Sequence, residues 1–291
     1  MKKLSILFLF FFSLVGCSHS PYYNPKLGGE MSLPGKTYDS FFIESDSGNQ
    51  LHTVFISSES AKSKGLVVHF HGNAGNISET VEKYLWVTDQ QYDLLLFDYS
   101  GYGNSSGEPN FDNLQADAKT VFRFVEQQFS SLENYALISI GTSLGGAVML
   151  DGLLDSKQRD MFQLVVVDSS FHSFPAVAQH VVDQSSLGFL GSWLIPIVID
   201  TSHDPLPRLH QLNDTQILFV HCESDALIPW QFSEKMYQNS DVEKSLELLQ
   251  GCDHARTFTP ESASNRPLLL SYFEDISTPN NALESLSKID N

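Results

Sequence analysis

The chain has 291 residues and a formal net charge of −18, with 35 acidic against 17 basic side chains. Such an acidic surface is repelled by nucleic acid and by anionic membranes, so a nucleic-acid partner is not expected. No block of like charges stands out, and the charge therefore indicates a solvated surface rather than a binding tail.

The first residues have the pattern of a secretory signal peptide. Lys2 and Lys3 precede the apolar run 4–15, which is shorter than the roughly 20 residues that a membrane-spanning helix needs. The run ends in Leu14-Val15-Gly16-Cys17. These four residues resemble the lipobox of bacterial lipoproteins, in which the chain is cut before the cysteine and the cysteine is acylated.

The lipobox resemblance implies a lipid-anchored protein of the bacterial cell envelope. Residues 1–16 would be the signal peptide, and Cys17 would carry acyl chains such as palmitate, which together anchor far more firmly than one chain. Ser18 follows, and no Asp stands there to signal inner-membrane retention, so by resemblance we expect the outer membrane, facing the periplasm. An ordinary signal peptide with an unrelated cysteine is the alternative.

Two polar segments enclose one domain-sized region. Residues 17–37 are rich in Ser, Pro, Gly and Asn and predict a lipidated tether, and residues 278–291 predict a flexible tail. Between them, residues 38–277 are long enough for a single domain with a large core. The sequence leaves the oligomeric state open.

The apolar pattern of this domain alternates between strands and helices. One helix is predicted from Asn76, which has capping-box spacing to Glu79, and another over 111–129. The predicted strands are 41–43, 51–56, 66–70, 93–97, 137–140, 164–167, 217–220 and 246–249. Strands alternating with helices predict an α/β fold, with a mainly parallel sheet of about eight strands and helices on both faces. In such sheets the working site lies at the carboxyl ends of the strands.

The fifth predicted strand runs into a glycine-flanked serine, Gly141-Thr142-Ser143-Leu144-Gly145. A serine held on a sharp strand-to-helix turn needs neighbours without side chains, because side chains two positions away would collide. The turn would expose the Ser143 hydroxyl and aim the Leu144 N–H toward a developing oxyanion. An incidental serine between a strand and a helix is the alternative interpretation.

Further chemical groups follow the other predicted strands. They are His71-Gly72-Asn73-Ala74-Gly75-Asn76, the glycine-rich stretch 98–107 that begins with Asp98, then Asp225 and finally His254. With Ser143, these motifs resemble the α/β-hydrolase fold serine hydrolases of the lysophospholipase-like, serine aminopeptidase-like and protein-depalmitoylating group. The resemblance covers about residues 38–275, and the order Ser, acid, His is that of α/β hydrolases.

The resemblance implies a catalytic triad of Ser143, Asp225 and His254. His254 would take the Ser143 proton and return it to the leaving group, and Asp225 would hold the imidazole in the right tautomer. The N–H groups of Leu144 and Asn73 would form the oxyanion hole. This chemistry needs neither a metal nor a cofactor.

Several residues near these motifs have competing interpretations. Asp168 ends the sixth strand and is the main rival for the triad acid, since some hydrolases of this fold carry it there. Asp98 is expected to tie its glycine-rich loop together rather than to catalyse. His69 and His71 point the same way on a strand and suggest a metal site only weakly, because no carboxylate or cysteine accompanies them. His71 is expected to hold the oxyanion loop.

The crowded apolar segment 171–203 is either a lid over Ser143 or a set of core helices. A lid would favour an acyl or aromatic substrate. The leading hypothesis is a serine hydrolase that cleaves a small-molecule or lipid-like carboxylic ester or thioester through an acyl-enzyme. The alternatives are a peptidase or amidase of the same fold and a non-enzymatic envelope lipoprotein that binds a ligand.

The two remaining cysteines, Cys222 and Cys252, follow the seventh and eighth strands. In the fold that the resemblance implies, these two strands are neighbours about 4.8 Å apart, so their ends could be close enough for a disulfide in an oxidising compartment. Such a bridge would clamp the acid loop to the histidine loop. Two buried thiols that only pack are the alternative.

Overall fold

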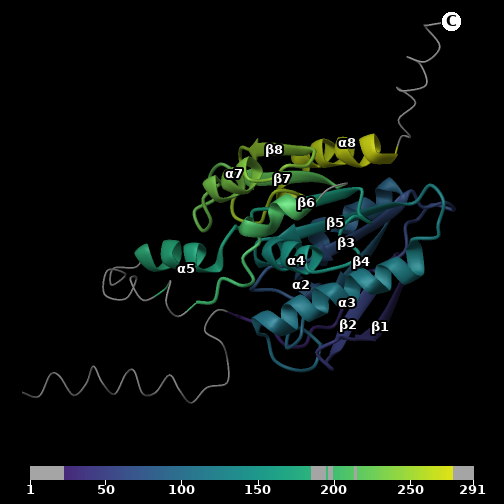
Figure 1. Cartoon of the computed structure of the whole chain (residues 1–291). Coiled ribbons are helices and arrows are strands. Elements are labelled where there is room, and N and C mark those ends of the chain that lie inside the picture. The colour runs from purple at the N-terminus through teal and green to yellow at the C-terminus, as the bar shows by residue number, and fades with distance from the viewer. Residues whose placement is uncertain (1–22, 185–194, 196–198, 213–214, 278–291) are drawn as a thin grey trace, which may run out of the picture.

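A computed structural model describes residues 23–184, 195, 199–212 and 215–277. The predicted signal peptide, the predicted lipidation site Cys17 and the predicted tail 278–291 lie outside these residues. The described chain forms one eight-stranded sheet with the order β1-β2-β4-β3-β5-β6-β7-β8 (Figure 1). The strands are β1 (Tyr38–Glu44), β2 (Gln50–Ile56), β3 (Gly65–Phe70), β4 (Tyr92–Phe97), β5 (Ala136–Thr142), β6 (Leu164–Asp168), β7 (Gln216–Cys222) and β8 (Lys244–Leu249).

The sheet is mainly parallel, as predicted. β1 pairs with β2 and β2 with β4 in antiparallel fashion, whereas every pairing from β4 through β3 to β8 is parallel. The carboxyl ends of the six parallel strands therefore share one edge. The loops that carry the predicted motifs all leave from this edge, which is where open α/β sheets place their sites.

Helices cover both faces of the sheet (Figure 1). The α-helices are α2 (Ile77–Tyr84), α3 (Phe111–Phe129), α4 (Leu144–Leu154), α5 (Phe174–Asp183), α7 (Gln231–Gln238) and α8 (Arg266–Ser277), and the 3-10 helices are η1 (Leu85–Gln90), η4 (Leu206–Gln211) and η5 (Pro260–Asn265). Two apolar cores result. One joins the sheet to α3, α4 and α7, and the other joins its opposite face to α2 and α8.

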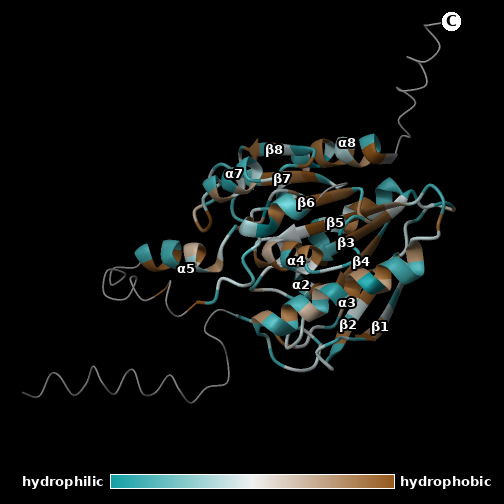
Figure 2. Cartoon of the chain, viewed as in Figure 1, coloured by the Kyte–Doolittle hydropathy of each residue, from teal (hydrophilic) through white to brown (hydrophobic). Residues whose placement is uncertain are grey.

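The central strands are mostly apolar (Figure 2), because both faces of the sheet are covered. All residues of β3, β4 and β5 are buried. The long helices are amphipathic, and α3 turns Leu114, Val121 and Val125 toward the core. The predicted cap is present at α2, where the Asn76 side chain accepts a hydrogen bond from the Glu79 N–H.

The segment before β1 lies against the domain over its described part, although the sequence groups it with the tether. Leu27 forms a parallel bridge with Gly103. The Gly28 N–H donates to the Gly103 carbonyl, and the Gly103 N–H donates to the Lys26 carbonyl. Tyr23 is buried. Residues 23–29 therefore pack as part of the fold beside the glycine-rich loop that follows β4.

None of the helices within the described ranges combines the length and the apolar character needed to cross a membrane.

Candidate active site

Ser143 lies on a sharp turn between β5 and α4, as the sequence predicts. Its backbone angles are φ 56° and ψ −120°, in the left-handed half of conformational space that L-residues rarely adopt. A Cβ on Gly141 would lie 2.5 Å from the Gly146 Cα, and one on Gly145 would lie 2.1 Å from the Phe70 carbonyl oxygen. Only glycine fits at these two positions, so the strained turn depends directly on the Gly-x-Ser-x-Gly sequence.

Three predicted residues form a continuous chain of hydrogen bonds. The His254 Nε2 lies 3.0 Å from the Ser143 Oγ, and the His254 Nδ1 lies 2.7 Å from the Asp225 Oδ2. They come from the ends of β5, β7 and β8, which are far apart in sequence and near one another at the sheet edge. This geometry allows His254 to accept the Ser143 proton while Asp225 holds the opposite ring nitrogen.

Asp225 is buried but well supplied with donors. Its Oδ1 accepts the N–H groups of Leu227 at 2.9 Å and Ile228 at 2.8 Å. Its Oδ2 lies within hydrogen-bond distance of two imidazoles, those of His254 and His221. Burial by itself would raise the pKa of Asp225, but the hydrogen bonds from His221 and His254 outweigh burial and hold this pKa well below its usual range. The carboxylate therefore stays ionised beside His254.

His221 is a site residue that the sequence interpretation missed. It lies buried in β7, with its Nε2 3.2 Å from the Asp225 Oδ2 and 2.8 Å from the Ile228 carbonyl oxygen. Its Nδ1 lies 2.7 Å from the Ser233 Oγ. Because the Ile228 carbonyl can only accept, Nε2 carries the proton and Nδ1 accepts from Ser233. A histidine inside an otherwise apolar strand, four residues before the acid, was the available signal.

Asp168, the rival acid, serves a different part of the structure. Its Oδ2 accepts hydrogen bonds from the Tyr84 hydroxyl at 3.0 Å and the Thr257 hydroxyl at 2.6 Å, and its Oδ1 accepts from Ser169 at 2.9 Å. Thr257 belongs to the loop that also carries His254. Asp168 therefore links the histidine loop to α2 through Thr257 and Tyr84, whereas Asp225 contacts the imidazole itself.

The two predicted oxyanion donors flank Ser143. Leu144 begins α4, so its N–H belongs to a helix N-terminus, where backbone donors and the helix dipole favour negative charge. Asn73 lies in the loop after β3 and lines the same pocket as Ser143. Its side-chain Oδ1 accepts the Asn24 N–H at 2.8 Å and the Tyr102 hydroxyl at 2.7 Å.

The other polar residues of these loops hold the backbone in place. The His71 Nδ1 donates to the Gly72 carbonyl, and the Tyr99 hydroxyl donates to the His71 carbonyl, so His71 braces the loop that carries Asn73. The Asp98 Oδ1 accepts the Ile77 N–H, and its Oδ2 accepts the Asn104 N–H. Asp98 thus ties the glycine-rich loop to α2.

No group of three or more His, Cys, Asp or Glu side chains in the described part of the chain is arranged to hold a metal ion. The His69 Nε2 lies 3.1 Å from the Thr142 hydroxyl. Burial lowers the pKa of both His69 and His71, which keeps both rings neutral inside the fold.

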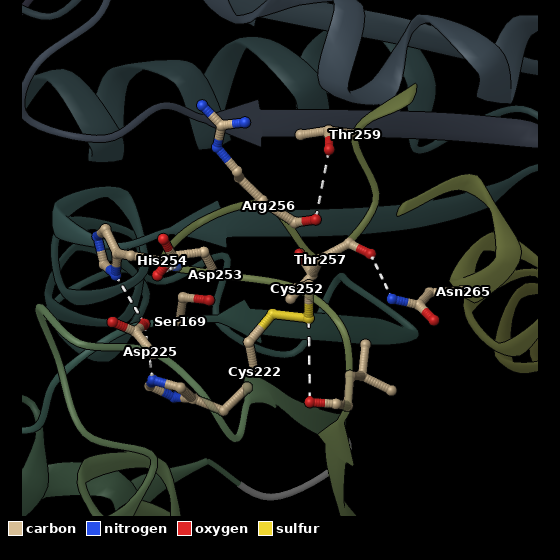
Figure 3. Close-up of a disulfide and its surroundings, with 12 residues drawn as sticks. Ser169, Cys222, Asp225, Cys252, Asp253, His254, Arg256, Thr257, Thr259 and Asn265 are labelled. Atoms are coloured by element: carbon tan, nitrogen blue, oxygen red, sulfur yellow. Dashed lines mark hydrogen bonds and ion pairs between the residues drawn. A yellow bond between two sulfur atoms is a disulfide. The ribbon is translucent and has the colours of Figure 1, made fainter. Parts of the chain in front are cut away.

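A disulfide joins Cys222 to Cys252 (Figure 3). The sequence alone leaves two alternatives for these cysteines, a disulfide or two buried thiols. Their Cα atoms lie 5.6 Å apart, and Cys222 pairs in register with Leu249 across β7 and β8. Figure 3 shows the bond beside the contact between Asp225 and His254. The two loops that carry these residues are therefore linked covalently a few residues from the site.

A cavity of about 400 Å³ opens beside Ser143. Its described walls are mostly apolar, and none of them is a charged side chain; they are Tyr23, Asn73, Ser143, Leu144, Phe171, Phe174, Val177, Ala178, Val181, Val182, Leu227 and Ile228. Six of these belong to segment 171–203, five of them on α5, which Figure 1 places apart from the helices that cover the sheet. The described part of this segment therefore forms a wall of the site, while 185–194 and 196–198 lie outside the described residues.

The sheet order, the strained Ser143 turn and the sequential order Ser, Asp, His are the defining features of α/β hydrolases. Comparison with known proteins leads to the same fold class. The model of a family described as "Serine aminopeptidase, S33" matches residues 61–205. The chain is an α/β hydrolase of the serine hydrolase class, and thus an enzyme.

The chain is similar to individual proteins in sequence and to solved structures in fold. The chain is 29% identical over 215 residues to the uncharacterized protein YfhR of Escherichia coli K12, with 73% of this chain and 72% of YfhR covered. It is 24% identical to the lysophosphatidylserine lipase ABHD12 of Danio rerio, covering 68% of this chain and 52% of that protein. Among solved structures, the Pyrococcus furiosus esterase Pf2001 superposes with a TM-score of 0.65 at 18% identity, covering 86% of this chain and 97% of the esterase.

Proposed function

We propose that this hydrolase cleaves a carboxylic ester or thioester through an acyl-enzyme formed on Ser143. The observation that carries the proposal is the hydrogen-bond chain from the Ser143 Oγ through His254 to Asp225. A neutral hydroxyl is a weak nucleophile, and a base within 3.0 Å removes that limitation. The ionised Asp225 stabilises the imidazolium that forms when His254 takes the proton.

The reaction proceeds in two halves. The Ser143 Oγ attacks the carbonyl carbon while its proton passes to the His254 Nε2, and the carbonyl oxygen becomes an oxyanion that the N–H groups of Leu144 and Asn73 stabilise. The intermediate collapses, the bond to the leaving group breaks, and His254 donates its proton to the departing alcohol or thiol. Water then attacks the acyl-enzyme with His254 again as base, which releases the acid and restores Ser143.

The pocket supports an ester of an apolar acyl group rather than a peptide. An aminopeptidase must bind a cationic amino terminus, which calls for a carboxylate in the pocket. The described walls hold none and instead offer apolar surface to an acyl chain. The names of the relatives, a lysophosphatidylserine lipase and an esterase, agree with an ester substrate.

We also propose that the enzyme is anchored through acyl chains on Cys17 in the outer membrane, facing the periplasm. The lipobox-like residues 14–17 support the anchor. The Cys222–Cys252 disulfide supports an oxidising compartment, because such bonds persist outside the reducing cytosol. Cell fractionation with Cys17→Ser tests this proposal. The wild type is expected in the membrane fraction with acyl chains, and a soluble, unacylated wild type contradicts it.

Ser143→Ala tests the catalytic proposal. The wild type should react with a fluorophosphonate and hydrolyse p-nitrophenyl esters faster than peptide amides, and Ser143→Ala should lose both activities while keeping its fold. Ser271→Ala, on the exposed surface of α8, is the matched control and should behave like the wild type. A folded wild type that neither labels nor turns over ester favours the non-enzymatic binding protein.

A further inference from the structure

Residues 23–29, here called the strap, run across the loops that form one side of the site. The Asn76 side chain donates to the carbonyls of Lys26 and Gly28, and the bridge between Leu27 and Gly103 fixes the strap to the glycine-rich loop. The Lys26 ammonium lies 2.7 Å from a Glu79 carboxylate oxygen. The strap is thereby attached to the loop after β3, to the loop after β4 and to α2.

We propose that the strap is part of the active site, with Tyr23 as the wall that sets the size of the acyl group and the Asn24 backbone as the brace of the oxyanion loop. This inference rests on the proposed esterase function and deepens it. It identifies determinants of specificity and positioning outside the catalytic domain that the sequence delimits at residue 38.

The Tyr23 ring is a fixed wall of the pocket. Tyr23 is 8% exposed and lines the cavity beside Ser143. Its ring packs edge-on against Phe111, with 5.7 Å between centroids, and Phe111 packs in the same way against Phe174 at 4.7 Å. Phe174 also lines the cavity. The three rings hold one another in place between the strap, α3 and α5, so the volume behind Tyr23 is closed to substrate.

The ring of Tyr23, rather than its hydroxyl, forms the wall of the pocket. The hydroxyl is shielded from solvent and has no hydrogen-bond partner in the described structure. Burial raises the pKa of this phenol, so it stays neutral. Removing the oxygen therefore leaves the wall intact, whereas removing the ring opens it.

Asn24 acts through Asn73. Its backbone N–H donates to the Asn73 Oδ1, and the Tyr102 hydroxyl donates to the same oxygen. These two bonds fix the side chain of the residue whose N–H is proposed to bind the oxyanion. The Asn24 side chain is exposed, so only the backbone of Asn24 is needed for this contact.

The wall is tested by the acyl-chain preference of Tyr23→Ala and Tyr23→Phe, assayed with p-nitrophenyl esters from acetate to laurate. Tyr23→Ala should raise the ratio of kcat/KM for long over short chains by about 10-fold or more. Each additional methylene that fits into an apolar pocket strengthens binding of the transition state and so raises kcat/KM. Tyr23→Phe should keep the wild-type profile and thermal stability. A profile that falls uniformly in Tyr23→Ala, or that does not change, overturns the wall.

The brace is tested by Asn24→Pro, which removes the N–H donor, against Asn24→Ala, which keeps it. Because one neutral hydrogen bond is lost, Asn24→Pro should lower kcat roughly 3- to 10-fold with KM little changed, and Asn24→Ala should match the wild type. Equal behaviour of the two variants overturns the brace. If the wild type labels and turns over ester but the variants fail these tests, only this inference falls. If the wild type neither labels nor turns over ester, the proposed function falls.

Discussion

Two buried aspartates stand at the ends of adjacent strands, and only one of them touches the histidine. Asp168 is the last residue of β6, and Asp225 follows β7 by three residues. They share a residue type, a sheet edge and nearly complete burial. Asp225 forms a hydrogen bond with the His254 Nδ1, whereas Asp168 accepts hydrogen bonds from hydroxyl groups of α2 and of the histidine loop. Position at the active edge thus gives an aspartate access to the site, and loop geometry decides what it does there.

The largest expected effect is that of Asp225→Asn on turnover. An amide in place of the carboxylate no longer stabilises the imidazolium and favours the wrong tautomer of His254, so kcat should fall by about 10⁴-fold. Steady-state kinetics with a p-nitrophenyl ester measures this. A loss smaller for Asp225→Asn than for Asp168→Asn would assign the acid to β6.

His221→Phe sharpens the comparison, because it removes a donor to Asp225 and leaves Asp168 untouched. Hydrogen bonds to charged groups contribute about 1.5–3 kcal/mol, so kcat should fall roughly 10- to 100-fold with KM nearly constant. Ser233→Ala is the control, since it removes the partner of the Nδ1 and leaves the Nε2 contact with Asp225 in place. Equal losses in the two variants would indicate a packing role for His221.

The disulfide distinguishes the Asp225 loop from the Asp168 strand end. Replacing Cys222 and Cys252 by Ser releases a loop closed across a sequence separation of 30 residues and should lower the free energy of unfolding by about 3–4 kcal/mol. Thermal denaturation measures the change, and turnover at low temperature should fall only a few-fold because His221 and the backbone still hold Asp225. An unchanged melting temperature would contradict a stabilising bridge.

Asp168→Asn should act on stability rather than on chemistry. Asn keeps one acceptor oxygen but weakens the contacts with Tyr84 and Thr257, so unfolding should become easier by about 1–3 kcal/mol. The value of kcat should stay within a few-fold of the wild type at a temperature where the variant is folded. Chemical denaturation and ester turnover on the same sample separate the two effects.

The smallest expected effect is on the pH dependence of stability. The Asp225 carboxyl has a pKa below its usual range in the folded protein, while an unfolded Asp titrates near about 3.9. Its contribution to stability is therefore fully present above that pH and is lost as the pH falls toward the folded-state pKa. Asp225→Asn should show a shallower loss of stability below about pH 4 than the wild type, measured by denaturant titration.

Asp117 is expected to make stability depend on pH in the opposite direction, because its pKa is raised rather than lowered. Burial raises its pKa to about 6, against which the hydroxyls of Ser45 and Ser100 act only in part. The folded state therefore binds the Asp117 proton more tightly than the unfolded state, and this contribution to stability is lost as the pH rises through about 6. Asp225 thus limits the pH range of maximum stability at its acidic end, and Asp117 limits it at its upper end.

Local patterns were sufficient for the eight strands, for α2 and α3, and for the turn that carries Ser143. Short, nearly continuous apolar runs in the sequence lie on the central strands, and the capping of α2 by Asn76 follows from residues three positions apart. The Ser143 turn needs glycine at 141 and 145 for steric reasons that act within a few residues. Each of these features depends on neighbours in sequence, so the sequence alone predicts them.

The partners of the aspartates, the role of His221 and the place of the strap depend on contacts between distant segments. The choice between Asp168 and Asp225 is made by where the loop of His254 returns to the sheet. His221 is recognised only when its Nε2 is found beside Asp225. Tyr23 belongs to a segment whose composition is that of a linker, and only its packing on Phe111 places it in the pocket. The sequence determined which chemical groups follow the strands, because the succession of strands along the chain and their apolar patterns are local. Tertiary structure alone decided which groups touch, because distances between loops are set by how the whole sheet and its helices pack.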